Sequence, residues 1–169
     1  MTTAPLPAGA TEAPLRWSDA LLLGFAPMDR CHAEFVDVVA ALQAAPDAEL
    51  PARLAAVRAH LQSHFAQEDE WMTATGFPAR ECHVGEHAAV LASVAQVEVL
   101  LSRGDTATCR RLADELARWF PGHADVMDAA LAHWMCKRRH GGKPLVFRRS
   151  LGAGGQPPAP SSKPPSIPR

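Results

Sequence analysis

Histidines and carboxylates recur along the chain at spacings that suit a metal site. His64 and Glu68 lie four residues apart, as do His83 and His87. Because residues i and i+4 of a helix lie on one face one turn apart, each pair can present two donor atoms in the same direction. With the other candidates, the set comprises five imidazoles and two carboxylates: His32, His64, Glu68, His83, His87, His123 and Asp128.

The size of this set indicates more than one metal ion. A single zinc site is filled by about four ligands, so seven candidates predict either a dinuclear centre or a coincidence. A lone histidine on an apolar face is more often a hydrogen-bonded core residue than a ligand. Burying so many imidazoles and carboxylates together is costly unless something compensates them, and no Lys or Arg shares their helix faces. Metal ions are the simplest compensation.

The pair formed by His123 and Asp128 needs a local distortion. These residues lie five apart, a spacing that does not stack on an ideal α-helix. Either a π-type widening or the proline at position 121 must re-aim one of the two side chains. Such widenings occur often at functional sites.

The residues around these candidates repeat with a helical period. Each of four amphipathic segments carries at least one candidate on its apolar side, and proline or glycine breaks separate the segments. Short breaks between helices of this length predict an all-α, up-down-up-down four-helix bundle, whose core is a usual place for metal sites. The apolar patterns cover residues 27–45, 50–71, 83–101 and 112–134.

The segments outside the bundle differ in composition. We predict a flexible N-terminus over residues 1–14 and a four-helix domain over 15–140, in which residues 15–26 form an arm packed against one end of the bundle. Residues 141–169 are predicted to be a disordered tail, because they are rich in Gly, Pro and Ser. All acidic residues precede position 137, so the chain ends in a basic segment. A solvated tail is the simplest interpretation. The alternative is that the tail docks to an acidic partner, an anionic membrane or nucleic acid, of which nucleic acid is the one that we do not expect.

Composition and cysteine usage predict a cytoplasmic protein. The chain is 47% hydrophobic and 21% charged, as in soluble domains, and neither a signal peptide nor a transmembrane segment is evident. Its four cysteines form no C-x-x-C pair, so reduced thiols are expected. Cys31 and Cys82 each precede a candidate histidine, and a redox pair there is the alternative. We expect a monomer, and we interpret His60, His133 and His140 as solvated.

The pattern H…HxxxE…HxxxH…HxxxxD resembles the ligand signature of the hemerythrins, including the bacterial hemerythrins. The resemblance covers about residues 15–136, and flanking residues agree with it. These are Trp17-Ser18, Gly24-Phe25, Asp29, Trp71-Met72, Gly76-Phe77-Pro78 and Trp119.

The resemblance implies two iron ions joined by an oxo or hydroxo bridge. His83, His87 and His123 would hold one iron and His32 and His64 the other, with Glu68 and Asp128 bridging both. The iron with two histidines would be one position short, and O₂ would bind there reversibly. Phe120 and Ala124 would line the O₂ pocket. Many relatives carry a branched apolar residue after this last histidine, so Ala124 is expected to open the pocket and speed autoxidation.

Several functions remain compatible with such a site. Five imidazoles and two carboxylates favour an oxygen carrier, store or sensor over an oxygenase, and no residue is assigned a catalytic role. No attached signalling domain is visible, which favours storage or delivery over sensing. The alternatives are a di-iron oxidoreductase acting on peroxide or nitric oxide, an iron-buffering protein, or a site filled by zinc or manganese.

Overall fold

The computed structural model describes residues 14–139, and over this range the secondary structure is entirely helical. The predicted flexible N-terminus (residues 1–14) and disordered basic tail (residues 141–169) lie, apart from residue 14, outside the described residues. Four rods make up the structure. They are α1 (Ala26–Gln43), α2 (Leu50–Thr75), α3 (Arg80–Leu101) and a fourth rod in which α4 (Thr106–His123), a π-helical turn η3 (Ala124–Asp128) and α5 (Ala129–Arg139) follow without a break.

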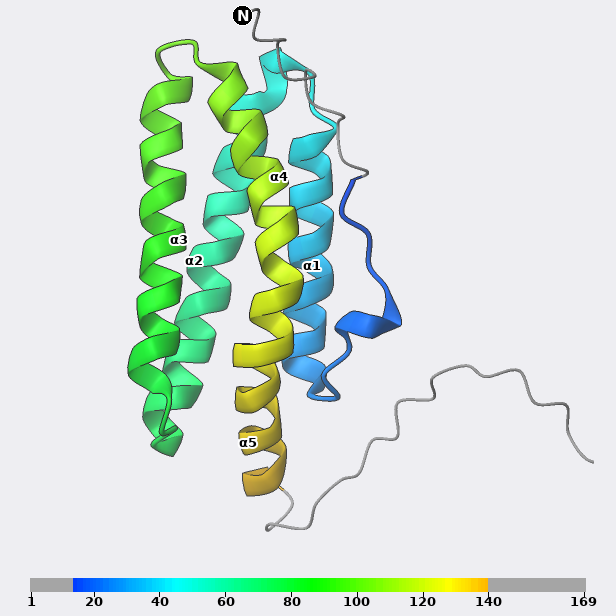
Figure 1. The fold of residues 1–169 in the computed structure, drawn as a ribbon, viewed down its shortest axis with the longest axis vertical. Helices are drawn as coiled ribbons and strands as arrows, with labels where there is room; N and C mark the ends of the chain where they lie inside the picture. Colours follow the sequence, from blue (N-terminus) through cyan, green and yellow to red (C-terminus); the bar gives the residue numbers. More distant parts are fainter. Residues whose placement is uncertain (1–13, 140–169) are drawn as a thin grey trace, which may run out of the picture.

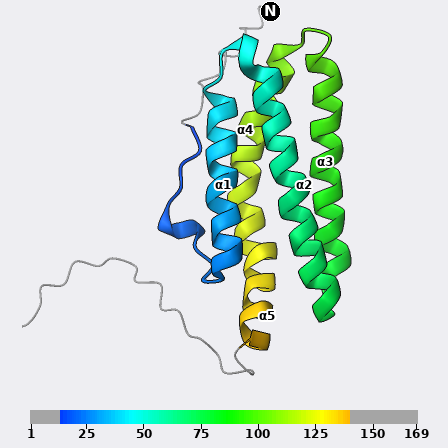
Figure 2. The ribbon, with the colours of Figure 1, turned by 180° about the vertical axis from the view of Figure 1, so that it is seen from behind.

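The four rods alternate in direction and form a bundle (Figures 1 and 2). Each helix packs against the next in the chain, and α1 also packs against α4, which closes the bundle. Short connections suffice because consecutive rods are antiparallel neighbours. The predicted all-α four-helix bundle is therefore confirmed.

Local sequence signals set the ends of the helices. Proline occupies the first turn of α1 and of α2, where no backbone N–H is required for the helix. Gly76 ends α2 in the left-handed conformation (φ 63°), and Phe77 N–H then donates to the Met72 carbonyl (2.9 Å). Asp105 caps α4 by accepting a hydrogen bond from the Thr108 backbone N–H (2.9 Å).

Two apolar clusters fill the bundle on either side of the candidate site. The larger cluster includes Phe35, Leu54 and Phe120, and the smaller one includes Met28 and Leu131. Along α1, α2 and the fourth rod, the metal-ligand candidates fall where residues of the larger cluster give way to residues of the smaller one. The candidates therefore lie in a level of the bundle that apolar side chains close above and below.

The N-terminal arm lies along α1 and not against one end of the bundle, which corrects the sequence prediction (Figure 1). Near one end of α1, Leu15 N–H donates to Gln43 Oε1 (2.8 Å). Near the other end, Asp29 accepts hydrogen bonds from the backbone N–H groups of Leu23 (2.8 Å) and Gly24 (3.1 Å). The arm contains only a short 3-10 helix, Asp19–Leu21, and these bonds satisfy backbone donors on either side of it, so they hold the arm at both ends.

Helix α3 is long and apolar enough to cross a membrane by length and composition alone. The apolar runs of the sequence predict no such segment. A packed helix of a bundle can meet the same criterion, and α3 packs against both α2 and α4. Two of its buried residues are the polar His83 and His87, which face the interior of this bundle.

The core packing predicts a specific loss of stability. Leu54 is 1% exposed in the larger cluster, so Leu54→Ala should lower the free energy of unfolding by about 2–5 kcal/mol through lost burial and a residual cavity. Val99 is 50% exposed, and Val99→Ala should change it by less than about 0.5 kcal/mol. Urea denaturation of both variants tests this; equal losses would contradict the described core.

Candidate metal centre

The structure brings all seven predicted residues together in the middle of the bundle. Each is at most 6% exposed. Their donor atoms form two groups, and within each group all donor atoms lie within 4.8 Å of one another. The first group is Glu68, His83, His87, His123 and Asp128, and the second is His32, His64 and Glu68.

Glu68 faces both groups with different oxygen atoms. Its Oε1 lies 3.1 Å from His64 Nε2 in the second group. Its Oε2 lies 3.3 Å from His87 Nε2 and 3.5 Å from His83 Nε2 in the first group. A carboxylate in this position can bind two cations at once, one through each oxygen.

Asp128 faces the same two groups in the same way. Its Oδ2 lies 3.1 Å from His32 Nε2. Its Oδ1 lies 3.1 Å from His83 Nε2 and 3.2 Å from His123 Nε2. Two carboxylates, contributed by different helices, therefore share the space between the histidine groups.

The π-helical turn is what brings Asp128 to this position. Ala129 N–H donates to the Ala124 carbonyl, an i to i+5 hydrogen bond that defines the widened turn. The extra residue in the turn places His123 and Asp128 on one side of the rod despite their five-residue spacing. Of the two distortions considered from sequence, the π-type widening is confirmed. Pro121 lies within α4, which continues to His123.

The donor atoms are close to one another yet poorly hydrogen-bonded. Both oxygens of Asp128, Oε2 of Glu68 and the Nε2 atoms of His32 and His87 are buried without a hydrogen-bond partner. Leaving a buried polar atom unpaired costs about 1–3 kcal/mol. Cations placed among these atoms would satisfy them, and imidazole nitrogen with carboxylate oxygen is a donor set that suits iron, zinc and other transition metals. The residues present therefore fit metal ions.

Both carboxylates of the cluster are favoured in their charged form. Burial alone would raise the pKa of Asp128, but its interactions with the imidazoles of His123, His32 and His83 outweigh burial and hold that pKa well below its ordinary value. Burial likewise opposes a lowered pKa at Glu68, where interactions with His64 and His87 prevail. At neutral pH, therefore, neither carboxylate has to release a proton before it binds a cation.

Phe120 and Ala124, the predicted pocket residues, lie in the apolar core beside the second group. Each is 1% exposed. Phe120 meets the His32 ring edge to face, with ring centroids 5.1 Å apart, and packs on Phe35 at 4.5 Å. The wall beside His32 is thus apolar.

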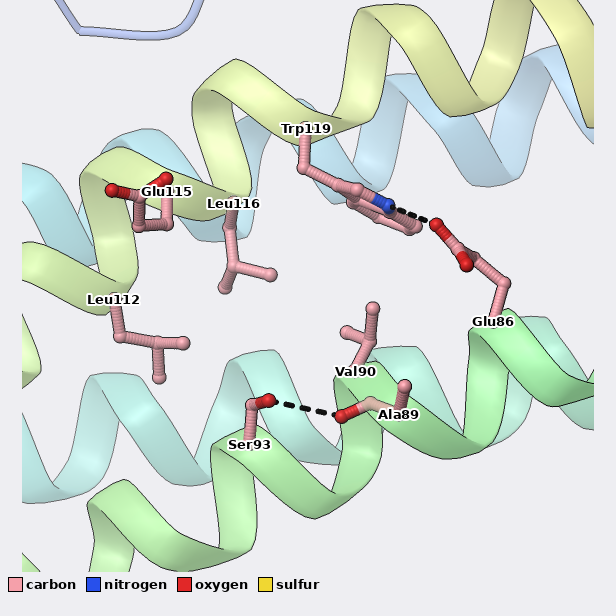
Figure 3. A pocket seen from close by; sticks show the side chains of 8 residues that line it. All are labelled: Glu86, Ala89, Val90, Ser93, Leu112, Glu115, Leu116 and Trp119. Carbon is pink, nitrogen blue, oxygen red and sulfur yellow. Dashed lines mark hydrogen bonds between the residues drawn. The ribbon is translucent and has the colours of Figure 1, made fainter.

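A different aromatic residue covers the first group. The Trp119 ring lies 4.4 Å from the His123 ring, between centroids. Its Nε1 donates to Glu86 Oε1 (3.2 Å) across a surface pocket of about 210 Å³ between α3 and α4 (Figure 3). The hydrogen bond fixes the indole between this pocket and His123.

Two residues near the site were not predicted correctly. His60 is not solvated: its side chain is only 12% exposed, and its ring lies 5.5 Å from that of His64. Burial, and then the neighbouring His64, lower its pKa.

Asp69 was overlooked, although its Oδ1 lies 3.0 Å from His87 Nδ1. Its position next to Glu68 in the sequence is the one feature that could have indicated a role at the site. A carboxylate at the edge of a helix face, however, is usually solvated.

The remaining predictions on single residues concern thiols and outer histidines. All four cysteines are free, as expected. Burial raises the pKa of Cys31, which lowers its thiolate fraction and argues against a reactive pair with Cys82. His133 is exposed, and His140 lies outside the described residues.

Comparison with known proteins agrees with this geometry. Residues 23–134 match the family model of the hemerythrin HHE cation binding domain. The chain is 42% identical over 124 residues to a bacteriohemerythrin of Ralstonia nicotianae (strain ATCC BAA-1114 / GMI1000), an alignment that covers 73% of this chain and 90% of that protein. No solved structure matches the chain. The fold, the buried cluster of histidines and carboxylates and these two matches lead to one conclusion: the chain belongs to the hemerythrin family and is a cation-binding protein of the HHE type.

Proposed function

We propose that the protein holds two iron ions and binds O₂ reversibly. The observation that carries the proposal is the position of Glu68 and Asp128, each of which turns one oxygen to each histidine group. We assign His83, His87 and His123 to one iron and His32 and His64 to the other, and Glu68 and Asp128 would contribute to holding both. The relative named bacteriohemerythrin supports this assignment.

The unequal histidine count gives the two ions different roles. When bound, two ferrous ions supply the electrons that reversible O₂ binding requires. The second group offers one imidazole fewer than the first, so an ion held there by His32 and His64 would have one protein ligand fewer, which would leave room for a small ligand. Phe120 stands against His32 on this side and keeps the surroundings apolar.

The donor set favours binding of O₂ over its use in oxidation. Five neutral imidazoles and two carboxylates provide little negative charge, whereas carboxylate-rich di-iron sites stabilise higher oxidation states of iron. The two apolar clusters enclose the site on two sides, which we expect to limit the access of water and of larger substrates. We therefore infer a store or carrier of O₂ and not an enzyme.

Metal content and O₂ binding can be tested together. Protein loaded anaerobically with ferrous iron should hold about two irons per chain, develop a visible charge-transfer band on exposure to air and lose it under argon. His64→Ala should lower the iron content to about one, because it removes one of only two imidazoles from the second group. His133→Ala, which changes an exposed histidine, should keep two.

Three results would contradict the proposal. A count near one in the unaltered protein would remove the dinuclear centre. Rapid, irreversible oxidation on air exposure, with continued turnover of peroxide or nitric oxide, would favour a di-iron oxidoreductase instead, and preferential retention of zinc or manganese would exclude the oxygen carrier.

Ala124 is expected to control autoxidation. It is buried beside Phe120, and a larger apolar side chain there should exclude water from the second group, so Ala124→Ile should slow the loss of O₂ binding several-fold. Because overpacking can itself destabilise a core, Ala124→Val provides a smaller step. Val126→Ile, at a position 68% exposed, is the control. When autoxidation is followed by absorbance, its rate should be highest in the unaltered protein and the control and lower in both Ala124 variants. An unchanged rate in both Ala124 variants would refute this role.

Removal of the basic tail tests the domain boundary. All seven candidate ligands lie within residues 32–128, so a chain that ends at residue 140 should bind the same amount of iron and unfold at the same urea concentration as the full chain. Loss of iron from the shortened chain would mean that the domain extends beyond residue 140.

A further inference from the structure

One histidine of the cluster differs from the other four in its second nitrogen. His87 Nδ1 lies 3.0 Å from Asp69 Oδ1. By contrast, within the described residues the Nδ1 atoms of His32, His64, His83 and His123 are buried without a hydrogen-bond partner. Only His87 among the five histidines is held by a carboxylate outside the cluster.

The His87 ring is also held by its faces. The Phe65 ring stacks on it with centroids 3.8 Å apart and an angle of 6° between the planes. With the ring plane set by Phe65 and its rotation set by Asp69, Nε2 points to the cluster, where it lies 3.3 Å from Glu68 Oε2. Phe65, Glu68 and Asp69 all belong to α2, so one helix orients a histidine contributed by α3.

The hydrogen bond selects one tautomer of the ring. A carboxylate can only accept, so His87 Nδ1 is the donor in this hydrogen bond, and in the neutral ring the lone pair then resides on Nε2, which faces the cluster. A carboxylate behind an imidazole also increases its electron donation to a metal. Asp69 reaches only the first group, since its partner belongs to that group.

We propose that Asp69 is a positioning residue for the first metal group: it holds His87 in the metal-binding tautomer and strengthens the binding of the ion at His83, His87 and His123. This inference rests on the proposed function, because it requires that cations bind at the cluster. The consequence is that the two ions differ in how tightly they are held. The competing explanation is that Asp69 merely ties α2 to α3 and has no effect on the metals.

The neighbouring residue provides a matched control. Glu70 carries the same charge, is exposed and accepts only a 3.4 Å hydrogen bond from Gln67. Glu70→Gln therefore removes one negative charge near the site without touching a histidine. Asp69→Asn removes the charge but keeps an oxygen that can accept from Nδ1, and Asp69→Ala removes both.

The test measures how fast iron leaves the protein. Each variant of the full chain is loaded anaerobically with ferrous iron, its iron content is counted, and release to a ferrous chelator is followed by absorbance. In Asp69→Ala, one of the two irons should leave roughly ten to a hundred times faster than in the unaltered protein, the range typical of lost partners of metal ligands. Asp69→Asn should lie between the two, and Glu70→Gln should match the unaltered protein.

Each alternative outcome is distinguishable. If Asp69→Ala and Asp69→Asn release both irons at the unaltered rates, or if Glu70→Gln is as fast as Asp69→Asn, the inference is wrong while the proposed centre stands. If the unaltered protein holds no iron, this inference and the proposed function both fail.

Urea denaturation of the metal-free forms tests the competing explanation. If Asp69 only ties α2 to α3, Asp69→Ala should unfold at a lower urea concentration without any change in the ratio of the two iron-release rates. Should Asp69→Ala not fold, Asp69→Asn alone decides.

Discussion

Two buried carboxylates shared between two groups of histidines are the constraint on which this structure depends. Anions inside an apolar bundle are unfavourable unless positive charge or hydrogen-bond donors meet them. Here Glu68 and Asp128 lie against imidazoles from α1, α2, α3 and α4, and several of their atoms still lack hydrogen bonds. The positions of all four rods, the closure of the bundle by α1 and α4, and the apolar layers above and below serve to hold these atoms at one level.

Much of this arrangement can be predicted from the sequence because it is periodic. Spacings of three and four residues identify the helices, proline and glycine mark their ends, and the pairs His64/Glu68 and His83/His87 identify one face of a helix. The five-residue spacing of His123 and Asp128 even indicates a distortion, since an undistorted helix would separate them. What could not be predicted depends on contacts between elements: the path of the arm along α1, the burial of His60 against His64, and the reach of Asp69 across to His87. A single helix pattern does not specify which neighbour covers the edge of its apolar face.

The surroundings of the two histidine groups differ as much as the groups themselves. Around the first, Phe65, Trp119 and Asp69 restrain the rings of His87 and His123 through stacking and hydrogen bonds. Around the second, His32 meets the apolar Phe120, and no polar group restrains its outer nitrogen. A restrained group suits an ion that stays in place, and an apolar, less restrained group suits an ion whose coordination changes.

The π turn also sets the rotational register of the last part of the fourth rod, that is, which of its side chains face the interior. A π turn contains one residue more than the α-helical turn it replaces, and a residue advances an α-helix by about 100°. Without it, every side chain after position 124 would be rotated by that angle, which would turn both Asp128 and the core residue Leu131 away from the interior. The bridging carboxylate and the packing of α5 therefore depend on the same widened turn, and a substitution that restored α-helical hydrogen bonding there without removing a residue would disrupt both.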